Sequence, residues 1–247
     1  MTPLQHQTAL VTGAAKRIGK VLALALAENG ANVAITYRDS EAEAARTVAE
    51  LRALGVQASA FQCDVRSPES IQQAIAAVAS AFGRLDILVN NAGIFETAAL
   101  ESITVPQWDA MFETNTRGPF LVSQAAYPQL KAAHGRIINI GSLGGVHPWP
   151  THGHYCTSKA ALHMLTATMS KAFAPEISVN CVAPGMIVTN GNGSNGETSA
   201  EYEHFAHKTP MRRNGTPQDV AQAVLFFATG PHFITGQILG VDGGLGL

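Results

Sequence analysis

The fold of this 247-residue chain is decided by the stretch Thr12-Gly-Ala-Ala-Lys-Arg-Ile-Gly19. A β-forming run at 8–12 leads into it, and apolar residues at helical spacing follow at 17–29. Gly13 allows a tight turn after the strand, and Gly19 allows the new helix to pack closely on that strand. The start of the helix offers main-chain N–H groups and the positive end of its dipole to a phosphate. The stretch therefore predicts the pyrophosphate-binding turn of a Rossmann fold, although a plain strand–helix turn would also use these glycines.

Short β-rich runs alternate with longer helical patterns along the rest of the chain. Seven strands that alternate with helices predict an α/β fold, a parallel sheet covered on both faces. No linker, repeat or charge block interrupts the pattern, so we expect residues 1–247 to form a single Rossmann-fold domain. The further strands are expected at 32–36, 58–63, 85–89, 136–140, 177–182 and 237–241, and the further helices at 40–54, 68–82, 106–130 (one or two stretches), 154–173 and 219–228.

One polar stretch stands out inside this pattern, at 190–199 (NGNGSNGETS). Such a run within a compact domain is typical of a mobile loop, and often of a lid. We therefore expect a substrate loop or lid at about 186–208, with a surface insertion as the alternative.

Composition excludes several classes of function. Charged residues make up only 14% of the chain and the net charge is −2, so a nucleic-acid partner has no electrostatic support. No run of about 20 apolar residues is present to span a membrane, and the N-terminus lacks a secretory pattern. The three cysteines (Cys63, Cys156 and Cys181) show neither metal spacing nor a disulfide framework. We expect a cytoplasmic protein without a metal ion, with part of its surface covered by identical subunits.

The end of the second strand bears on which dinucleotide is bound. NAD-binding folds often have an acid there for the ribose 2′-hydroxyl, whereas an arginine accommodates a 2′-phosphate. The residues are Tyr37-Arg38-Asp39-Ser40, and Arg17 stands where the glycine turn usually has its middle glycine. Both guanidinium groups suit a phosphate. The sequence favours NADPH/NADP+, with Arg17, Ile18, Tyr37 and Arg38 among its contacts. Asp39 is the one residue here that would favour NAD, and its alternative role is to cap the next helix.

A second pattern is Tyr155-Cys-Thr-Ser-Lys159, with Ser142 thirteen residues upstream. Residues four apart share one face of a helix. A lysine cation nearby favours the phenolate form and lowers the pKa of a tyrosine from about 10, so the phenol becomes a useful general acid or base. Ser142 follows a strand and could hold a substrate oxygen beside the phenol. An ordinary amphipathic helix with a snorkelling lysine is the alternative.

Together these residues resemble the short-chain dehydrogenase/reductase family in its classical form, over the whole chain. The resemblance rests on the order and spacing of the glycine turn, Asp64-Val65, Asn90-Asn91-Ala92-Gly93, Asn115, Ser142, Tyr155, Lys159, Pro184-Gly185 and the terminal stretch 234–244.

The resemblance implies contacts to the cofactor. Asp64 and Val65 would flank the adenine. The nicotinamide end would be bound by three further groups of residues: Asn91, Ala92 and Gly93 along the cofactor channel, Pro184 and Gly185 around the nicotinamide, and Ile187 and Thr189 at its carboxamide.

The resemblance also implies the catalytic roles. Tyr155 would be the catalytic acid or base, and Lys159 would lower its pKa and hydrogen-bond the nicotinamide ribose. Ser142 would orient the substrate oxygen, and Asn115 would help bind the water chain that relays protons to Lys159. Hydride would pass between the nicotinamide and the substrate carbon. Helices 106–130 and 154–173 would pack between subunits, so a homotetramer is expected, with a dimer second.

The substrate stays open at this point. The leading expectation is a small carbonyl or imine compound. The residues at 12–19 and 37–40 look like the pteridine-reductase branch, and 3-oxoacyl-carrier-protein reductases share the same frame. A non-catalytic NADP-binding redox sensor would show a broken catalytic set, which is intact here. The segment between Ser142 and Tyr155 should border the substrate. Its aromatic and imidazole side chains could suit a planar or polar substrate, with loop packing and surface contacts as the alternative. No acid or cysteine joins them at metal-ligand spacing: His147, Trp149, His152 and His154.

Overall fold

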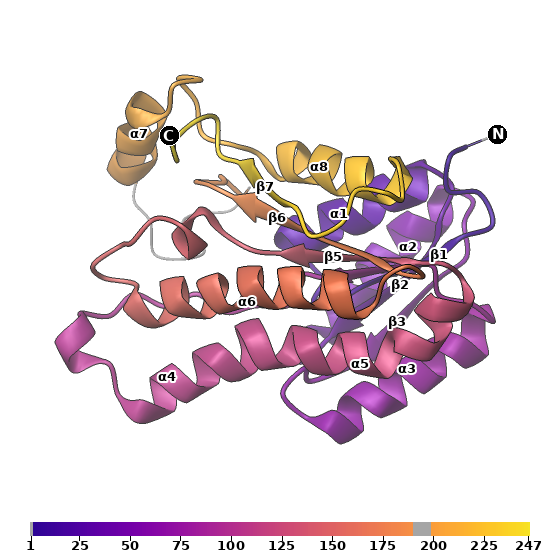
Figure 1. Ribbon diagram of the computed structural model, residues 1–247. Helices are drawn as coiled ribbons and strands as arrows, with labels where there is room; N and C mark the ends of the chain where they lie inside the picture. The colour runs from indigo at the N-terminus through magenta and orange to yellow at the C-terminus, as the bar shows by residue number, and fades with distance from the viewer. Residues whose placement is uncertain (1, 190–198) are drawn as a thin grey trace.

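A computed structural model describes residues 2–189 and 199–247, and a single parallel sheet lies at its centre (Figure 1). The order of the strands is β3-β2-β1-β4-β5-β6-β7, and every neighbouring pair is parallel. The predicted α/β fold with seven parallel strands is confirmed. The strands are β1 (Thr8–Val11), β2 (Asn32–Tyr37), β3 (Ala58–Gln62), β4 (Ile87–Asn90), β5 (Arg136–Ile140), β6 (Ser178–Pro184) and β7 (Ile238–Val241).

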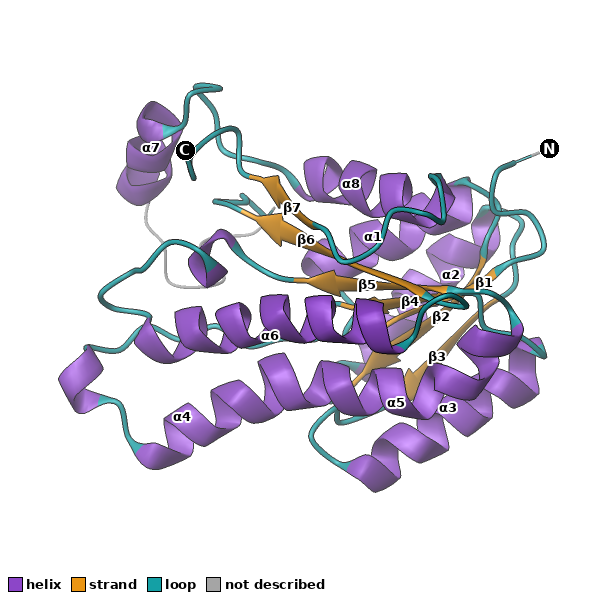
Figure 2. Cartoon of the chain, in the orientation of Figure 1, coloured by secondary structure: helices purple, strands orange, loops and turns teal. Residues whose placement is uncertain are grey.

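Helices cover both faces of this sheet (Figure 2). One layer holds α1 (Arg17–Glu28), α2 (Glu41–Ala53) and α8 (Pro217–Thr229), and the other holds α3 (Pro68–Phe82), α5 (Gly118–Ala132) and α6 (Gly153–Ala172).

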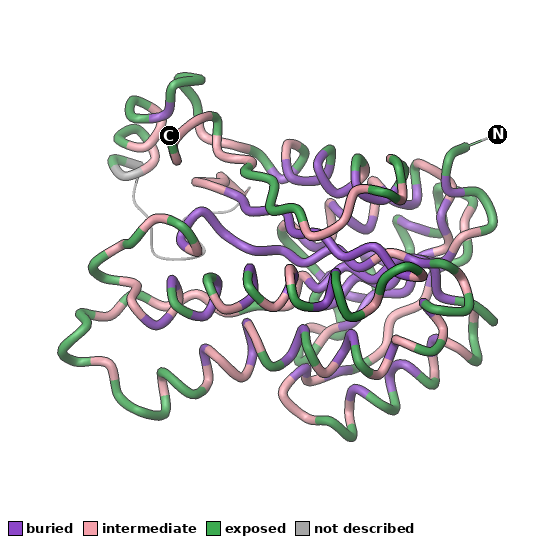
Figure 3. Tube along the Cα trace, in the orientation of Figure 1, coloured by how far each residue is buried: buried purple, intermediate pink, exposed green. Residues whose placement is uncertain are grey.

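Each layer buries its own apolar cluster against the sheet. Ala9 and Val11 of β1 belong to the cluster under α1 and α8, whereas Leu10 belongs to the cluster under α5. Successive side chains of a strand point to opposite faces, so a strand covered on both sides reads as an unbroken apolar run. The inner strands are accordingly buried (Figure 3). The two edge strands are less so: β3 is mostly half-buried, and β7 exposes Ile238 and Leu239. No described helix has the length and apolar content needed to cross a membrane.

The predicted helical segment 106–130 is interrupted in the structure. It comprises α4 (Val105–Phe112), a π-helical turn η2 (Glu113–Arg117) and α5. Within η2 the main-chain N–H of Gly118 bonds to the carbonyl of Glu113, five residues back. Single π turns inside α-helices are frequent at functional sites, and this one carries Asn115.

The predicted loop at 186–208 contains a helix, α7 (Ser199–Lys208). Tyr202, Phe205 and Ala206 are half-buried at helical spacing, a short apolar pattern that sequence reasoning did not use. Residues 190–198, most of the polar stretch predicted as a mobile loop, lie outside the described residues. Two short 3-10 turns complete the described part of the chain: η1 (Leu100–Ser102) and η3 (Leu143–Gly145).

The topology brings distant motifs to one edge of the sheet. All strands of a parallel sheet have their carboxyl ends on the same side. From β1 the chain adds β2 and β3 toward one lateral edge of the sheet, and after β3 it returns to add β4 on the other side of β1. Ligands bind such sheets outside the carboxyl ends of the strands, at this switch point. The motifs after β1, β4, β5 and β6 all lie there.

Candidate active site

The turn after β1 has no room for side chains at its two outer glycines. Gly13 has φ +63°, a conformation that L side chains rarely adopt, and a Cβ there would lie 3.0 Å from the Cα of Ala92. A Cβ at Gly19 would lie 2.5 Å from Nδ2 of Asn91 and 2.8 Å from the Cα of Ala14. The first turn of α1 can therefore approach the ends of β1 and β4 closely.

Two threonines and Asn91 hold this turn in place. The hydroxyl of Thr12 accepts hydrogen bonds from the main-chain N–H groups of Asn91 and Ala92, each at 3.0 Å. The side-chain amide of Asn91 donates to the carbonyls of Thr12 (2.8 Å) and Gly13 (3.1 Å). Thr36 Oγ1 accepts from the N–H of Gly13 at 3.1 Å. Asn91 thus holds the main chain of the turn in place. Sequence reasoning did not identify the roles of the two threonines, whose only signal is their place at the strand ends.

The start of α1 fits an anionic group. Arg17 has φ +55° and so adopts, at the place of the usual middle glycine, the left-handed conformation that glycine would adopt. No acidic residue lies in the first turn of α1, and the N-cap residue Lys16 makes no side-chain cap hydrogen bond. Ile18 is half-buried against the core. A helix start with these properties suits the pyrophosphate of a dinucleotide.

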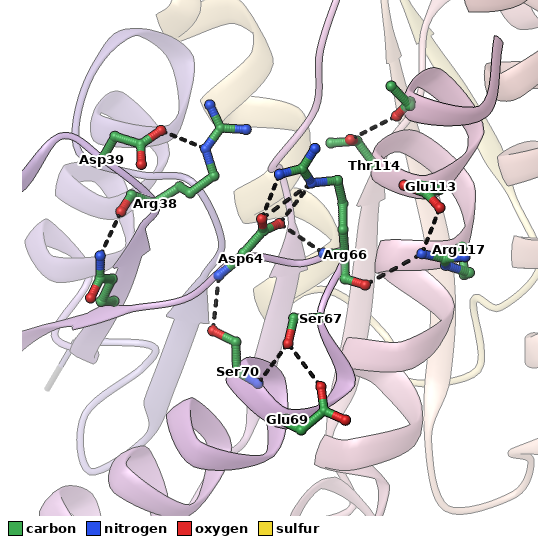
Figure 4. A network of polar contacts seen from close by, with 12 residues as sticks. Arg38, Asp39, Asp64, Arg66, Ser67, Glu69, Ser70, Glu113, Thr114 and Arg117 are labelled. Carbon is green, nitrogen blue, oxygen red and sulfur yellow. Dashed lines mark hydrogen bonds and ion pairs between the residues drawn. The ribbon is translucent and has the colours of Figure 1, made fainter. Parts of the chain in front are cut away.

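The ends of β2 and β3 carry a group of charged residues (Figure 4). Arg38 is exposed after Tyr37, and its Nε lies 2.5 Å from Oδ2 of Asp39. Arg66 binds the carboxylate of Asp64 with both Nε and Nη2, the latter at 2.6 Å. The hydrogen bond from Arg66 lowers the pKa of Asp64, and the charge of Arg38 adds to this. Arg66 was not identified from the sequence, where its only signal is its place directly after Asp64-Val65.

The same group of charges continues toward the predicted catalytic residues. The carbonyl of Arg66 accepts a hydrogen bond from Arg117 at 3.3 Å, and Arg117 pairs with Glu113 at 3.0 Å. Both partners belong to η2, the turn that carries Asn115 (Figure 4). Val65 is buried and packs against Gly118, where an added Cβ would lie 3.0 Å from Cγ2 of Val65. The adenine end of the predicted cofactor site is thus connected to η2.

Ser142 and Tyr155 lie on either side of Gly144. Ser142 follows β5 and caps η3, and its hydroxyl accepts the N–H of Gly144 at 3.0 Å. A Cβ at Gly144 would lie 3.4 Å from Oγ of Ser142 and 3.5 Å from Cε1 of Tyr155. The structure therefore brings the predicted serine and tyrosine together, from β5 and α6.

Lys159 lies one helical turn beyond Tyr155 and is buried. Its Nζ is 5.9 Å from the centroid of the Tyr155 ring and donates to the carbonyl of Ile140 at 2.8 Å. Burial lowers the pKa of Lys159 to about 8. A Cβ at Gly93 would lie 3.7 Å from this Nζ and 3.2 Å from Oδ1 of Asn115. The loop after β4 thus meets the lysine and Asn115 at one point.

Asn115 is fully buried, and its side chain joins two elements. Oδ1 accepts the N–H of Ile94 at 2.9 Å, and Nδ2 donates to the carbonyl of Ile94 at 2.9 Å and to Oγ of Ser158 at 3.2 Å. The amide therefore ties the loop after β4 to α6. Both ends of the amide are used in these contacts, and the water chain predicted beside Asn115 stays a prediction.

The residues after β6 lie at the same sheet edge. Gly185 donates its N–H to the carbonyl of Val241 at 3.0 Å, and a Cβ at Gly185 would lie 2.7 Å from Cβ of Asp242. Ile187 forms a bridge with Gly215 and packs on the core. Thr189 is the last described residue before 190, and Pro184 is the last residue of β6.

An aromatic wall borders Tyr155; we use this name for Phe95, Trp149 and His152. The Phe95 ring stacks on His152 with centroids 4.6 Å apart and meets Tyr155 edge-on at 4.8 Å. Trp149 meets His152 edge-on at 5.5 Å. Hydroxyls of Thr97 and Thr151 lie 3.0 and 2.9 Å from the two ring nitrogens of His152. Phe95 was not identified from the sequence, since nothing local links it to the tyrosine.

Two of the predicted histidines lie outside this wall. His147 is 2.6 Å from the carbonyl of Gly246 through Nε2. His154 is fully buried, 3.9 Å from Oε2 of Glu96. Within 2–189 and 199–247, no group of three or more His, Cys, Asp or Glu side chains is placed to hold a metal ion.

A phosphate turn at β1 and a serine–tyrosine–lysine group at the same sheet edge define a Rossmann-type oxidoreductase that uses a nicotinamide cofactor. The family described as Enoyl-(Acyl carrier protein) reductase matches residues 13–246. The chain belongs to the classical short-chain dehydrogenase/reductase family.

Known relatives cover the chain almost completely. A 3-oxoacyl-[acyl-carrier-protein] reductase of Synechocystis sp. is 39% identical over 99% of both chains. The crystal structure of a dehydrogenase/reductase from Sinorhizobium meliloti 1021 has a TM-score of 0.91 at 39% identity and covers 98% of this chain and 96% of its own. A 7α-hydroxysteroid dehydrogenase complexed with NADH and 7-oxo glycochenodeoxycholic acid has a TM-score of 0.93 at 33% identity, over 98% and 94%. These similarities do not distinguish the pteridine-reductase branch.

Proposed function

We propose that the protein is an NADP(H)-dependent reductase of a carbonyl or imine carbon in a small substrate. The observation that carries this proposal is the meeting of Ser142, Tyr155 and Lys159 beside Gly93, at the edge of the sheet where the glycine turn lies. The nicotinamide supplies the hydride when it is bound. This chain supplies the proton and places the substrate oxygen.

The roles of the three side chains follow from their positions. Tyr155 donates its phenolic proton to the substrate oxygen as the carbon is reduced. The Ser142 hydroxyl donates a hydrogen bond to the same oxygen and holds it beside the phenol. The buried cation of Lys159 stabilises the phenolate that is left, and its charge acts strongly because little water surrounds it. Asn115 holds the loop after β4 against α6, beside Lys159.

The preference for NADP over NAD is supported at the end of β2. Arg38 is exposed there, and the carboxylate of Asp39, which would repel a phosphate, is already paired with it. Arg66 adds a second guanidinium nearby. A 2′-phosphate would compete with Asp39 for Arg38. A relative of known structure binds NADH, so this preference needs its own test.

Arg38→Ala is expected to weaken NADPH binding by about 10- to 100-fold, since it removes a charge-assisted hydrogen bond to the phosphate. NADH binding should change little. Calorimetric titration of both cofactors measures this. Arg52→Ala is the matched control, because Arg52 in the last turn of α2 binds the carbonyl of Ala58, the first residue of β3, and so lies at the amino ends of the strands. A wild type that prefers NADH, or a variant that keeps the NADPH preference, would show the phosphate argument to be wrong.

The aromatic wall favours a substrate with a planar or ring-shaped body. A flat stack of Phe95 and His152 beside the proton donor suits a ring face. Ring ketones are therefore the leading class, in keeping with the steroid ketone bound by one relative. A dihydropterin is a second candidate, since it is planar and the chain has Arg17 in its glycine turn. An open-chain 3-oxoacyl thioester is the third, from the activity named for another relative.

A substrate panel tests the proposal. Ring ketones, quinones, dihydropterins and 3-oxoacyl thioesters are offered with NADPH, and the loss of reduced-nicotinamide absorbance is followed. We expect the highest kcat/KM for a ring ketone. Tight NADPH binding without turnover of any of these compounds would favour a redox-sensing protein instead.

Two separate apolar surfaces support a homotetramer. A groove of about 590 Å³ is lined by the apolar residues Trp108, Phe112, Phe120 and Leu165 from α4, α5 and α6. Polar residues of α4 and η2 complete its lining: Asp109, Glu113, Thr116 and Arg117. The second surface, at β7 and α8, exposes Phe226, Phe233, Ile238 and Leu239. Exposed apolar patches of this kind mark interfaces, and two different self-associating faces build a tetramer with two-fold symmetry.

Sedimentation measurements are expected to give the mass of four chains for the wild type. A charge placed in one surface, as in Phe233→Asp, should leave dimers, because the other surface still associates. A dimeric wild type would support the alternative assembly, and a monomeric one would contradict both.

A further inference from the structure

His163 lies one helical turn beyond Lys159 on α6, and the stretch 141–145 after β5 wraps around its ring. Only 4% of His163 is exposed. A Cβ at Gly141 would lie 2.4 Å from Nε2, and a Cβ at Gly145 would lie 2.4 Å from Cε1. Both positions therefore need glycine for the imidazole to fit. The main chain on both sides of Ser142 therefore packs directly against this ring.

The ring also contacts Ser142 directly. The main-chain N–H of Ser142 donates to Nε2 of His163 at 3.5 Å, a long hydrogen bond in a buried place. Nδ1 then carries the ring proton, and it has no hydrogen-bond partner among the residues that the structure describes. A buried N–H without a partner lowers stability relative to an apolar side chain of the same shape. Packing alone does not account for a histidine here.

We propose that His163 is a positioning residue: its neutral ring accepts the Ser142 N–H and thereby holds the Ser142 hydroxyl beside the phenol of Tyr155. This inference rests on the proposed function, because it assumes that Ser142 binds the substrate oxygen. His163 does not touch the substrate and acts only through Ser142.

The surroundings keep the ring in the accepting form. The ionisable groups beside it are Lys159 on its own helix and Cys181 of β6, whose Sγ would lie 2.6 Å from a Cβ at Gly141. Burial, and then the charge of Lys159, lower the pKa of His163 to about 4. The ring is therefore neutral across the working range of most enzymes. Only the neutral ring accepts a hydrogen bond.

Three substitutions separate the acceptor from the volume it fills. The amide oxygen of glutamine in His163→Gln can reach the place of Nε2, whereas asparagine in His163→Asn is too short, and His163→Leu fills the space without an acceptor. We expect kcat to fall about 10-fold in the leucine and asparagine variants and to stay within about 3-fold of wild type in the glutamine variant. NADPH affinity should be unchanged, and the leucine variant should unfold at the same or a higher temperature.

Met164→Leu is the matched control, because the neighbouring Met164 is exposed on the same helix; it should leave kcat unchanged. Unchanged kcat in the leucine variant would overturn the proposal. Should that variant fail to fold, the comparison of glutamine with asparagine still decides, and equal kcat values in those two would also overturn it.

A double-mutant cycle with Ser142→Ala shows through which residue His163 acts. If His163 acts through Ser142, adding His163→Leu to Ser142→Ala should lower kcat no further. A full additional 10-fold loss would contradict the inference and leave the proposed function standing. Unchanged kcat in Ser142→Ala alone would instead contradict the role proposed for Ser142 itself.

Discussion

Tyr155→Phe is expected to lower kcat by about 10²- to 10⁴-fold, the range over which a positioned proton donor accelerates a reaction. The substitution removes only the phenolic oxygen. The remaining ring can keep its edge-on contact with Phe95 at 4.8 Å, so the wall and the binding sites should persist. Affinity for NADPH is therefore expected to change little. Steady-state kinetics on a substrate found in the panel, together with a cofactor titration, measure the two effects separately.

Tyr127→Phe is the control for this experiment. Tyr127 lies on α5, and its ring packs on Phe173 with centroids 4.9 Å apart, away from the serine–tyrosine–lysine group. The Tyr127→Phe variant should turn over substrate at the wild-type rate. Near-wild-type turnover in Tyr155→Phe would refute the assignment of the proton donor. An equal loss in the control would point to a general effect of removing a hydroxyl.

Lys159→Met is expected to lower kcat by about 10²- to 10³-fold and, at neutral pH, to stabilise the protein. The rate falls because the phenolate loses its neighbouring cation. Stability rises because burial lowers the pKa of Lys159 from 10.5 to about 8, and this corresponds to roughly 3 kcal/mol of unfavourable charge burial. Loss of the hydrogen bond to Ile140 offsets about 1 kcal/mol of this gain.

The gain should depend on pH in a definite direction. Below about pH 8 the lysine is charged in both the folded and the unfolded states, so the folded wild type bears the whole cost of burying the charge. Between about pH 8 and 10.5 the folded state releases its proton first, and wild-type stability rises relative to the variant. Urea unfolding of both proteins at neutral and alkaline pH measures the difference.

Lys171→Met is the matched control, since Lys171 is exposed in the last turn of the same helix. Its stability should follow that of the wild type at every pH. A Lys159→Met protein that is less stable than wild type at neutral pH would contradict the burial argument. An unchanged kcat would contradict the catalytic role.

Local patterns were enough to predict a parallel sheet and the positions of its seven strands along the chain. The strands read as short apolar runs, because a parallel strand is buried on both faces, and Gly13 and Gly19 marked the turn through sterics. The interruption at η2 was not predictable from the spacing of apolar residues, because a π turn shifts the helical face by only one residue. Helix α7 was hidden because its apolar residues follow directly on a polar run.

The residues of the candidate site likewise fall into those that local patterns indicated and those that they did not. Ser142, Tyr155 and Lys159 could be named because two of them share a helix face and the third follows a strand. Phe95 and His163 could not be named in this way, since each matters through one contact with a residue distant in the chain: Phe95 with Tyr155, and His163 with Ser142. Arg66 pairs with Asp64 only two residues away, but its place near Arg38 became visible only where the ends of β2 and β3 meet.

By itself, the sequence determined the alternation of strands and helices, the glycine turn and the residue types of the proposed catalytic group, because these depend on spacings of a few residues. The tertiary structure alone decided that Asn91 and Asn115 hold main chain in place, and that His163 lies beneath Ser142. The physical reason is that hydrogen bonds and close packing act over about 3–4 Å, and only the folded sheet brings residues so distant in the chain within that range.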